Sequence, residues 1–338
     1  MKQRIRMEDI AKEIGVSKMC VSLALRGDPS ISHEMRRRVH EVADSMGYIP
    51  NRIAKGLASG RTHTIAAIVG GDLHDGYHNQ VLRAATEYAL TRGYTLTIGL
   101  SGNTLHNEEE MYLKFQQLMV EGFLAFHSLK SELYVKLLNQ GVPYVLYTKY
   151  FSDLPSDYVV CDDEHGGFMM THHLYELGHR RIGFVYDAVI QESSEIVNRI
   201  RGYRAALEAC NLPFDPALLL PNRFESLKAV FSNEHRPTAL FVCNDVIAAA
   251  TYIDIKRLGF RIPEDVSVGG YEGVYLGALL DPPLTTISTP LADMGVLACK
   301  RLIDKIEDDS LQKVVVRISL EPALTIRKST KRREETVQ

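Results

Sequence analysis

The 338-residue sequence contains no tryptophan, few cysteines and no long apolar segment. Its five cysteines are scattered without a Cys-x-x-Cys pair, which argues against a disulfide framework and a zinc site and favours a reducing compartment. No apolar run approaches the ~20 residues of a membrane span, and the charged N-terminus MKQRIRMEDI has no signal-peptide core. These absences predict a soluble, cytoplasmic protein without a metal site.

The motifs of common enzyme classes are missing as well. The glycines in GGDLHDG and GGYEGVYLG do not form the Gly-x-Gly-x-x-Gly pattern of a dinucleotide site, and P-loop, Gly-x-Ser-x-Gly and His-Glu-x-x-His motifs are absent. We therefore expect neither an enzyme nor a cofactor. Five histidines lack metal-ligand spacing and are expected to be structural or exposed: His127, His165, His172, His173 and His179.

Charge is distributed unevenly along the chain. The net charge is −3, yet residues 1–61 carry 12 Lys and Arg against 7 Asp and Glu, and residues 327–338 carry 5 against 2. The segment between them is therefore acidic. A basic head on an acidic body is expected where one domain binds a polyanion and the other does not, although charge varies along any chain.

The basic head predicts three short helices that fit a helix-turn-helix. Ala11 is small where two helices must cross, Gly15 accepts the positive φ of the turn, and Val21 is apolar where the second helix must be locked in place. A third helix is expected over residues 33–46 and contains the arginines at positions 36–38. These arginines support the assignment, although a solvated helix face would also contain such a run.

The second helix, over residues 18–25, would then enter the major groove by its N-terminal end. Lys18 donates to guanine in this arrangement, and Met19 packs on a base such as a thymine methyl. Ser22 lies within reach of bases or phosphate. Ser17, which caps the helix, and Arg26, at its far end, are expected to contact phosphate.

From residue 64 onward the sequence alternates between buried strands and helices, in two units of about 100 to 130 residues each. This alternation requires parallel strands joined by crossover helices, and it predicts two α/β subdomains with a cleft between them. Ligands of such sheets bind outside the carboxyl ends of the strands, so the candidate binding residues are those that directly follow strands.

Ordered motifs extend along nearly the whole chain: MEDIAKEIGVSKMCVSLALRGDPS, GYIPNRIAKGLASG, LGHRRIGFV, RIRGYRAAL, CNDVIAAATY, IPEDVSVGGYEG and PPLTTIS. Together they resemble the LacI/GalR family of transcriptional regulators. The resemblance implies an N-terminal all-α helix-turn-helix domain and an α/β core of two doubly wound parallel-sheet subdomains, similar to type I periplasmic binding proteins. It also implies a cytoplasmic, nucleoid-associated homodimer that represses from a near-palindromic double-stranded DNA operator.

The domain boundaries follow from these motifs. We expect a DNA-binding domain (1–49), a hinge (50–61), an effector-binding and dimerisation core (62–328) and a disordered tail (329–338). The core divides into a first subdomain (about 62–159 and 290–320) and a second subdomain (about 160–289 and 321–328).

In the family, the hinge folds only on specific DNA, and a leucine wedges into a minor-groove step. The matching leucine is Leu57, beside Ala54; packing between the two hinges of a dimer is the alternative role. Asn51 and Arg52 would contact phosphate or the groove. Leu23 departs from the family's frequent arginine or threonine, and it either reads a thymine methyl or packs.

The resemblance also implies effector-binding positions. Tyr77 and His78 match a usually aromatic pair that stacks on the ligand, and Arg199 matches an arginine that grips hydroxyls or a carboxylate. The remaining positions follow strands: Asp72, Thr148, Asp245 and Glu272. Thr148 and Glu272 both stand where aspartate is common.

These groups suit a sugar or sugar derivative, because a carboxylate or guanidinium can hold two hydroxyls. Each of them could instead be ordinary loop charge, and Asp245 could be a helix N-cap. A plain solute-binding protein would share the core but lack the basic head.

Overall fold

The computed structural model describes residues 5–49, 56, 60–70, 76–102, 104–126 and 128–333. The chain divides into two compact units, Met1–Thr62 and His63–Gln338. Among the helices of the described part, none combines the length and the apolar character needed to cross a membrane.

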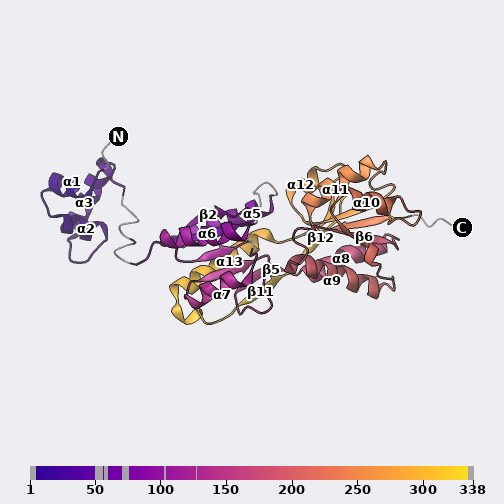
Figure 1. Ribbon diagram of the computed structural model, residues 1–338. Coiled ribbons are helices and arrows are strands. Elements are labelled where there is room, and N and C mark those ends of the chain that lie inside the picture. The colour runs from indigo at the N-terminus through magenta and orange to yellow at the C-terminus, as the bar shows by residue number, and fades with distance from the viewer. Residues whose placement is uncertain are drawn as a thin grey trace. The chain divides into compact units, whose positions relative to one another are not determined.

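The first unit is a three-helix domain made of α1 (Met7–Ile14), α2 (Lys18–Leu25) and α3 (His33–Ser45), which confirms the predicted helix-turn-helix (Figure 1). Gly15 adopts a left-handed conformation with φ of 79° and ends α1, where its N–H donates to Ala11 O at 2.9 Å. The helices meet in one apolar cluster: Ile10, Ala11, Ile14, Val21, Ala24, Val39 and Ala43. The predicted crossing, turn and locking residues therefore occupy their expected places.

The second unit begins with a six-stranded sheet in the order β11-β5-β4-β3-β1-β2, whose recorded pairs are all parallel. Its strands are β1 (Thr64–Val69), β2 (Thr95–Leu100), β3 (Phe123–Ala125), β4 (Tyr144–Tyr147), β5 (Tyr158–Cys161) and β11 (Arg317–Leu320). Its helices are α5 (Tyr77–Thr91), α6 (Leu105–Gln117), α7 (Ser131–Asn139) and α13 (Leu291–Glu307).

Helices cover both faces of this first sheet (Figure 1). Ile65, Ala67 and Val69 of β1 share a buried cluster with α5 and α13, whereas Ala66 and Ile68 share another with α6 and α7. This alternation follows from the two-residue period of a strand, and the double cover explains why β1 reads as a continuous apolar run. The predicted doubly wound arrangement is confirmed.

A second six-stranded sheet has the order β12-β10-β9-β8-β6-β7. Its strands are β6 (Ile182–Tyr186), β7 (Leu219–Pro221), β8 (Ala239–Val242), β9 (Ser267–Glu272), β10 (Thr285–Ser288) and β12 (Ala323–Thr325). Its helices are α8 (Asp163–Glu176), α9 (Ser194–Ala209), α10 (Phe224–Phe231), α11 (Asp245–Arg257) and α12 (Tyr275–Leu279). Short 3₁₀ turns occupy Pro216–Leu218 and Asp309–Leu311.

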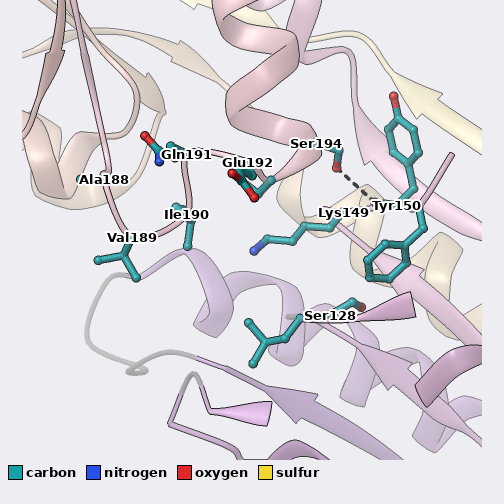
Figure 2. A pocket seen from close by; sticks show the side chains of 12 residues that line it. Ser128, Lys149, Tyr150, Ala188, Val189, Ile190, Gln191, Glu192 and Ser194 are labelled. Carbon is teal, nitrogen blue, oxygen red and sulfur yellow. Dashed lines mark hydrogen bonds between the residues drawn. The ribbon is translucent and has the colours of Figure 1, made fainter. Parts of the chain in front are cut away.

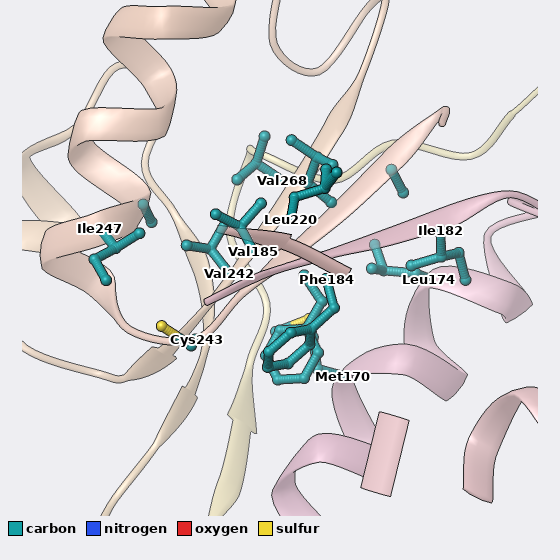
Figure 3. Close-up of a cluster of buried hydrophobic side chains, with 14 of the residues drawn as sticks. Met170, Leu174, Ile182, Phe184, Val185, Leu220, Val242, Cys243, Ile247 and Val268 are labelled. Atoms are coloured by element: carbon teal, nitrogen blue, oxygen red, sulfur yellow. The ribbon is translucent and has the colours of Figure 1, made fainter. Parts of the chain in front are cut away.

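The second sheet is parallel except at its edge, where β12 pairs antiparallel with β10. Its core is one large apolar cluster, and Figure 3 shows Phe184 of β6 beside Met170 of α8 within it. The described chain passes between the two sheets after β5, after β10 and after β11. We call the two halves of this unit the first lobe and the second lobe.

The predicted disorder of residues 329–338 is wrong for residues 329–333. Ser329 is fully buried in the second lobe: its hydroxyl donates to Val268 O at 2.5 Å and accepts from Thr285 N at 2.7 Å. Arg333 N donates to Leu177 O at 2.7 Å. The prediction relied on the charged composition of the segment and did not consider that Ser329 could complete buried backbone hydrogen bonds. Residues 334–338 lie outside the described part of the chain.

His179 fastens this C-terminal segment to the lobe. Its ring is buried, with Nδ1 3.0 Å from Thr238 Oγ1, and Nε2 3.0 Å from Ser267 Oγ and 3.2 Å from Lys331 O. Burial lowers the pKa of His179 to about 4. Because the folded-state pKa lies below the unfolded value of about 6.5, the neutral ring stabilises the fold fully above that pH and progressively less down to about pH 4.

We therefore expect wild-type protein to lose ~2 to 3 kcal/mol more unfolding free energy than His179→Gln between pH 7 and pH 4. Urea unfolding followed by circular dichroism at a series of pH values measures this difference. His235→Gln, at an exposed histidine of the same lobe, is the control and should follow the wild-type pH profile. Parallel profiles for wild type and His179→Gln would contradict the assignment.

Candidate functional site

The first candidate site is one face of α2. With 100° between successive residues of a helix, the predicted base- and phosphate-reading residues of this helix span an arc of about 100°: Lys18, Met19, Ser22 and Arg26. Val21 and Ala24 point into the domain core on the other side. Ser17 caps the helix, its hydroxyl accepting from Cys20 N at 3.1 Å. The local sequence thus orients a polar arc away from the core.

The side chains of this arc are exposed or half-buried. Met19 is 64% exposed, and Lys18 Nζ lies 2.6 Å from Glu8 Oε1 in an ion pair whose two side chains are both more than half exposed. Arg26 Nε donates to Ser22 O at 3.2 Å. Leu23 is half-buried and packing accounts for part of its surface. The arc can offer a cation and an apolar group at the start of the helix and a second cation at its end.

The three consecutive arginines of α3 do not act alike. Arg36 is held by the domain, because its guanidinium donates to Ile31 O at 3.0 and 3.1 Å. Arg37 and Arg38 are exposed. The hinge residues predicted to contact DNA lie outside the described residues and stay predictions: Asn51, Arg52, Ala54 and Leu57.

The second candidate site is a cavity of about 270 Å³ between the two lobes of the second unit. The first lobe contributes Tyr77, His78, Phe126, Thr148 and Lys149 to its lining. The polar residues from the second lobe are Asp187, Glu195, Arg199, Asn244 and Glu272. Five of the predicted effector residues meet here, whereas Asp72 lies outside the described residues and Asp245 does not line the cavity.

A neighbouring cavity of about 350 Å³ shares three lining residues with this 270 Å³ cavity: Lys149, Val189 and Ile190. Figure 2 shows Lys149 extended toward the loop that carries Ile190, and Tyr150 N donating to Ser194 Oγ at 3.1 Å. Asn198 Nδ2 also donates to the Tyr150 hydroxyl, at 3.2 Å. The segment after β4 in the first lobe is therefore hydrogen-bonded to the beginning of α9 in the second.

The aromatic wall of the cleft comes from the start of α5. The rings of Tyr77 and His78 lie edge to face, with centroids 5.5 Å apart, and His78 also faces Phe126 at 6.3 Å. The Tyr77 hydroxyl lies 3.2 Å from Thr148 Oγ1. Burial, with Glu272 nearby, raises the pKa of Tyr77, so its hydroxyl stays neutral.

Two residues of the lining have unusual backbone conformations. Thr148, directly after β4, has φ of 71°, and Glu272, at the end of β9, has φ of 101°. Positive φ is costly for residues with a Cβ, and most of all for a β-branched threonine. Such strain is concentrated at binding sites, where the surrounding structure holds it. Both strands therefore end in a turn that directs a polar side chain to the cleft.

Arg199 is fixed from behind by a buried ion pair. Its Nε donates to Asp163 Oδ1 at 2.8 Å, its Nη1 donates to Cys243 O at 2.5 Å, and its guanidinium lies 3.8 Å from the ring centroid of Tyr271. The side chains of Arg199 and Asp163 are each only 4% exposed. Burial raises the pKa of Asp163 to about 6 despite the arginine, so at neutral pH the pair is ionised.

Two glycines permit the close helix crossing behind this pair. A Cβ at Gly202 of α9 would lie 1.9 Å from Glu164 O, and one at Gly167 of α8 would lie 2.4 Å from Arg199 O. Any side chain there would push the helices apart. The sequence therefore needs glycine on both helices for Arg199 to reach Asp163.

Asp245 does not line the cleft in this structure, which disfavours its predicted role as an effector contact. It is fully buried, its Oδ1 accepting from Thr286 Oγ1 at 2.7 Å and its Oδ2 from Val274 N at 2.9 Å. Burial raises its pKa to about 6. The preceding Asn244 lines the cavity and caps α11, its Oδ1 accepting from Ile247 N at 2.7 Å. Because Asn244 occupies the N-cap of α11, the alternative prediction that Asp245 is the N-cap is also wrong.

Sequence reasoning missed a pair that spans the lobes. Lys149 Nζ lies 3.6 Å from Glu195 Oε1, and the side chains are 8% and 6% exposed. Each has a recognisable position: Lys149 comes just after β4, where site residues are expected, and Glu195 precedes Arg199 by one helical turn on α9. Asp187, just after β6, was missed in the same way.

Comparison with known proteins finds a family match in the three-helix domain and another in the two-lobed unit. The family described as "Bacterial regulatory proteins, lacI family" matches residues 6–51, and the periplasmic binding protein-like domain matches residues 171–330. The HTH-type transcriptional regulator DegA of Bacillus subtilis is 30% identical over 333 residues, covering 95% of this chain and 97% of DegA. The chain belongs to the LacI family of bacterial regulatory proteins. This family consists of transcriptional regulators and not of enzymes.

Other similar proteins include a repressor and two structures with bound ligands. The ribose operon repressor of Haemophilus influenzae is 28% identical over 334 residues, covering 96% of this chain and 98% of that repressor. A transcriptional regulator CelR–cellobiose complex has a TM-score of 0.73 at 26% identity, covering 96% and 100%. The lac repressor dimer bound to operator and the anti-inducer ONPF has a TM-score of 0.84 at 22% identity, covering 97% and 100%, and shows the shared fold.

For this LacI-family chain we expect Asp163→Asn to lower the unfolding free energy by about 3 kcal/mol, because it leaves a buried guanidinium without its counter-charge. Urea unfolding at pH 7.5 measures the loss. Asp162→Asn is the matched control, since asparagine caps α8 as well as the native aspartate does and should cost less than about 1 kcal/mol. Equal losses in the two variants would refute the importance of the pair.

Proposed function

We propose that this LacI-family member is a sequence-specific DNA-binding repressor whose operator affinity is controlled by a small-molecule effector in the cleft between the lobes. The observation that carries the proposal is the joining, in one chain, of a helix-turn-helix with a polar exposed arc to a two-lobed core with a ligand-sized cavity. A sugar-like effector is supported by relatives named for ribose and cellobiose. The protein acts in the cytoplasm at the nucleoid.

On DNA, the arc of α2 enters the major groove. Lys18 leaves Glu8 and donates to guanine, Met19 packs on a base, and Arg26 reaches phosphate. The hinge around Leu57 adds minor-groove contacts when it orders on the duplex. Since much of the affinity comes from phosphate contacts, binding weakens steeply with salt.

Regulation comes from the angle between the lobes. The described chain crosses between them at a few connections only, so an effector that contacts both lobes favours one angle. In a dimer this angle changes the separation of the two hinges and so the affinity for a near-palindromic operator. By linkage, operator DNA shifts effector affinity by the same factor, typically ~5- to 150-fold.

The homodimer forms through exposed apolar surface on the core. In the second lobe, Ile253 of α11 and Tyr275 and Leu279 of α12 are 69%, 74% and 62% exposed. In the first lobe, Ile98 and Leu100 are exposed on β2, the edge strand of its sheet. Exposed large apolar side chains and edge strands are typical of association surfaces.

The direct test selects duplexes from a random library with the full-length protein and then measures affinity for the selected operator by fluorescence anisotropy. We expect Lys18→Ala to weaken this binding by about 10-fold or more, because a base contact is lost along with a charge. Lys12→Ala removes the same charge from an exposed position of α1 and should weaken binding much less. Failure to enrich any sequence would overturn the proposed function.

The dimer surface has its own test. Ile253→Asp places a charge in the middle of the apolar patch, so we expect the dissociation constant of the dimer to rise at least ~10-fold. Sedimentation velocity over a concentration series measures it. Val189→Asp, at a valine beside the cleft that is 83% exposed, is the control and should leave the dimer unchanged. An unchanged dimer in Ile253→Asp would refute this face as the interface.

A further inference from the structure

The two cations among the described residues of the cleft lining are already paired with carboxylates of the protein. Arg199 is occupied by Asp163 and by Cys243 O, and Lys149 is paired with Glu195 across the lobes. Asp187 and Glu272 add two more carboxylates to the lining. Among the described residues, the lining therefore contains two cations and three carboxylates, with Asp163 as a fourth carboxylate behind them.

One buried oxygen of this site lacks a hydrogen bond. Glu195 is 5% exposed, its Oε1 faces Lys149, and its Oε2 has no hydrogen-bond partner among the described residues. A buried carboxylate oxygen without a donor costs free energy, and a donor from a bound molecule would recover it. Because Glu195 belongs to the lining of the cavity, a ligand group can approach it there.

An anionic ligand would meet the opposite situation. Its charge would face the carboxylates of Asp187 and Glu195 in a partly buried site, where like charges repel more strongly than in water. Among the described residues of the lining, the cations Lys149 and Arg199 are each already paired with a carboxylate. Drawing Lys149 away from Glu195 would leave a second buried carboxylate oxygen without a partner.

Resting on the proposed function, we infer that the cleft selects an electrically neutral, polyhydroxylated effector over its phosphorylated or carboxylated counterpart, and that Glu195 Oε2 accepts a hydrogen bond from an effector hydroxyl. Glu195 is then a specificity-determining residue. The aromatic rings of Tyr77, His78 and Phe126 cover the apolar face of such a molecule.

The experiment uses full-length protein and matched compounds: ribose with ribose 5-phosphate, glucose with glucose 6-phosphate and glucuronate, galactose with galacturonate, and cellobiose. Thermal shift at ~10 mM identifies binders, and calorimetry measures their affinities. We expect at least one neutral sugar to bind, and to bind at least ~10-fold more tightly than its anionic counterpart. An anionic member that binds as tightly or more tightly overturns the inference, and so does a panel without a neutral binder.

The variant Glu195→Gln removes the surplus charge and frees Lys149. We expect it to weaken the neutral sugar at least ~10-fold and to narrow the gap to the anionic counterpart. Glu208→Gln makes the same change at an exposed position near the other end of α9 and should leave both affinities unchanged. Equal affinities in Glu195→Gln and wild type overturn the role of Glu195, and the wild-type comparison decides charge selection even where the variant fails to fold.

Measuring operator affinity in the same preparations separates a failure of the charge-selection inference from a failure of the proposed function. Intact operator binding with preference for anionic sugars refutes only the inference drawn here. Loss of sequence-specific DNA binding in the wild-type protein refutes the proposed function itself, whatever the sugar preference.

Discussion

The cleft depends on the buried ion pair between Arg199 and Asp163. Both residues belong to the second lobe, and the glycines at the crossing of α8 and α9 let the pair form without distortion. The guanidinium therefore keeps its place whatever the angle between the lobes. Lys149 and Glu195, by contrast, come from different lobes, so their separation must change when the lobes move. We call the Arg199–Asp163 pair the fixed half of the cleft and the Lys149–Glu195 pair its variable half.

Much of this arrangement could be predicted from the sequence, because it follows from regular patterns. Strand–helix alternation predicts parallel sheets, and residues after parallel strands gather at one edge, so Thr148 and Glu272 could be placed in the cleft beforehand. The same reasoning could not predict that Asn244, and not Asp245, lines the cleft. Asparagine and aspartate cap helices about equally well, and Asp245 is held by Val274 and Thr286, 29 and 41 residues away. The order of residues 329–333 likewise depends on distant partners.

In the proposed DNA complex, the exposed arc of α2 would exchange a contact within the domain for a contact with a base. Lys18 is paired with Glu8, but both side chains are largely exposed, and an exposed pair of this kind is worth at most about 1 kcal/mol. Guanine can therefore replace Glu8 at little cost. A base that offers no acceptor would leave the lysine with its original partner and contribute nothing. The Lys18–Glu8 pair would thus help the protein to discriminate between DNA sequences, while Lys18 stays available for a base.

In the proposed mechanism, charge selection and regulation would both depend on the variable half of the cleft. Three contacts join the segment after β4 to the beginning of α9: Lys149 with Glu195, Tyr150 N with Ser194, and Asn198 with the Tyr150 hydroxyl. A neutral effector can add hydrogen bonds to these groups and strengthen the joined state. An anion that draws Lys149 away from Glu195 would instead work against a contact that joins the lobes. Because a ligand shifts an equilibrium only by its difference in affinity for the two states, the groups that choose the effector are also those that transmit its binding.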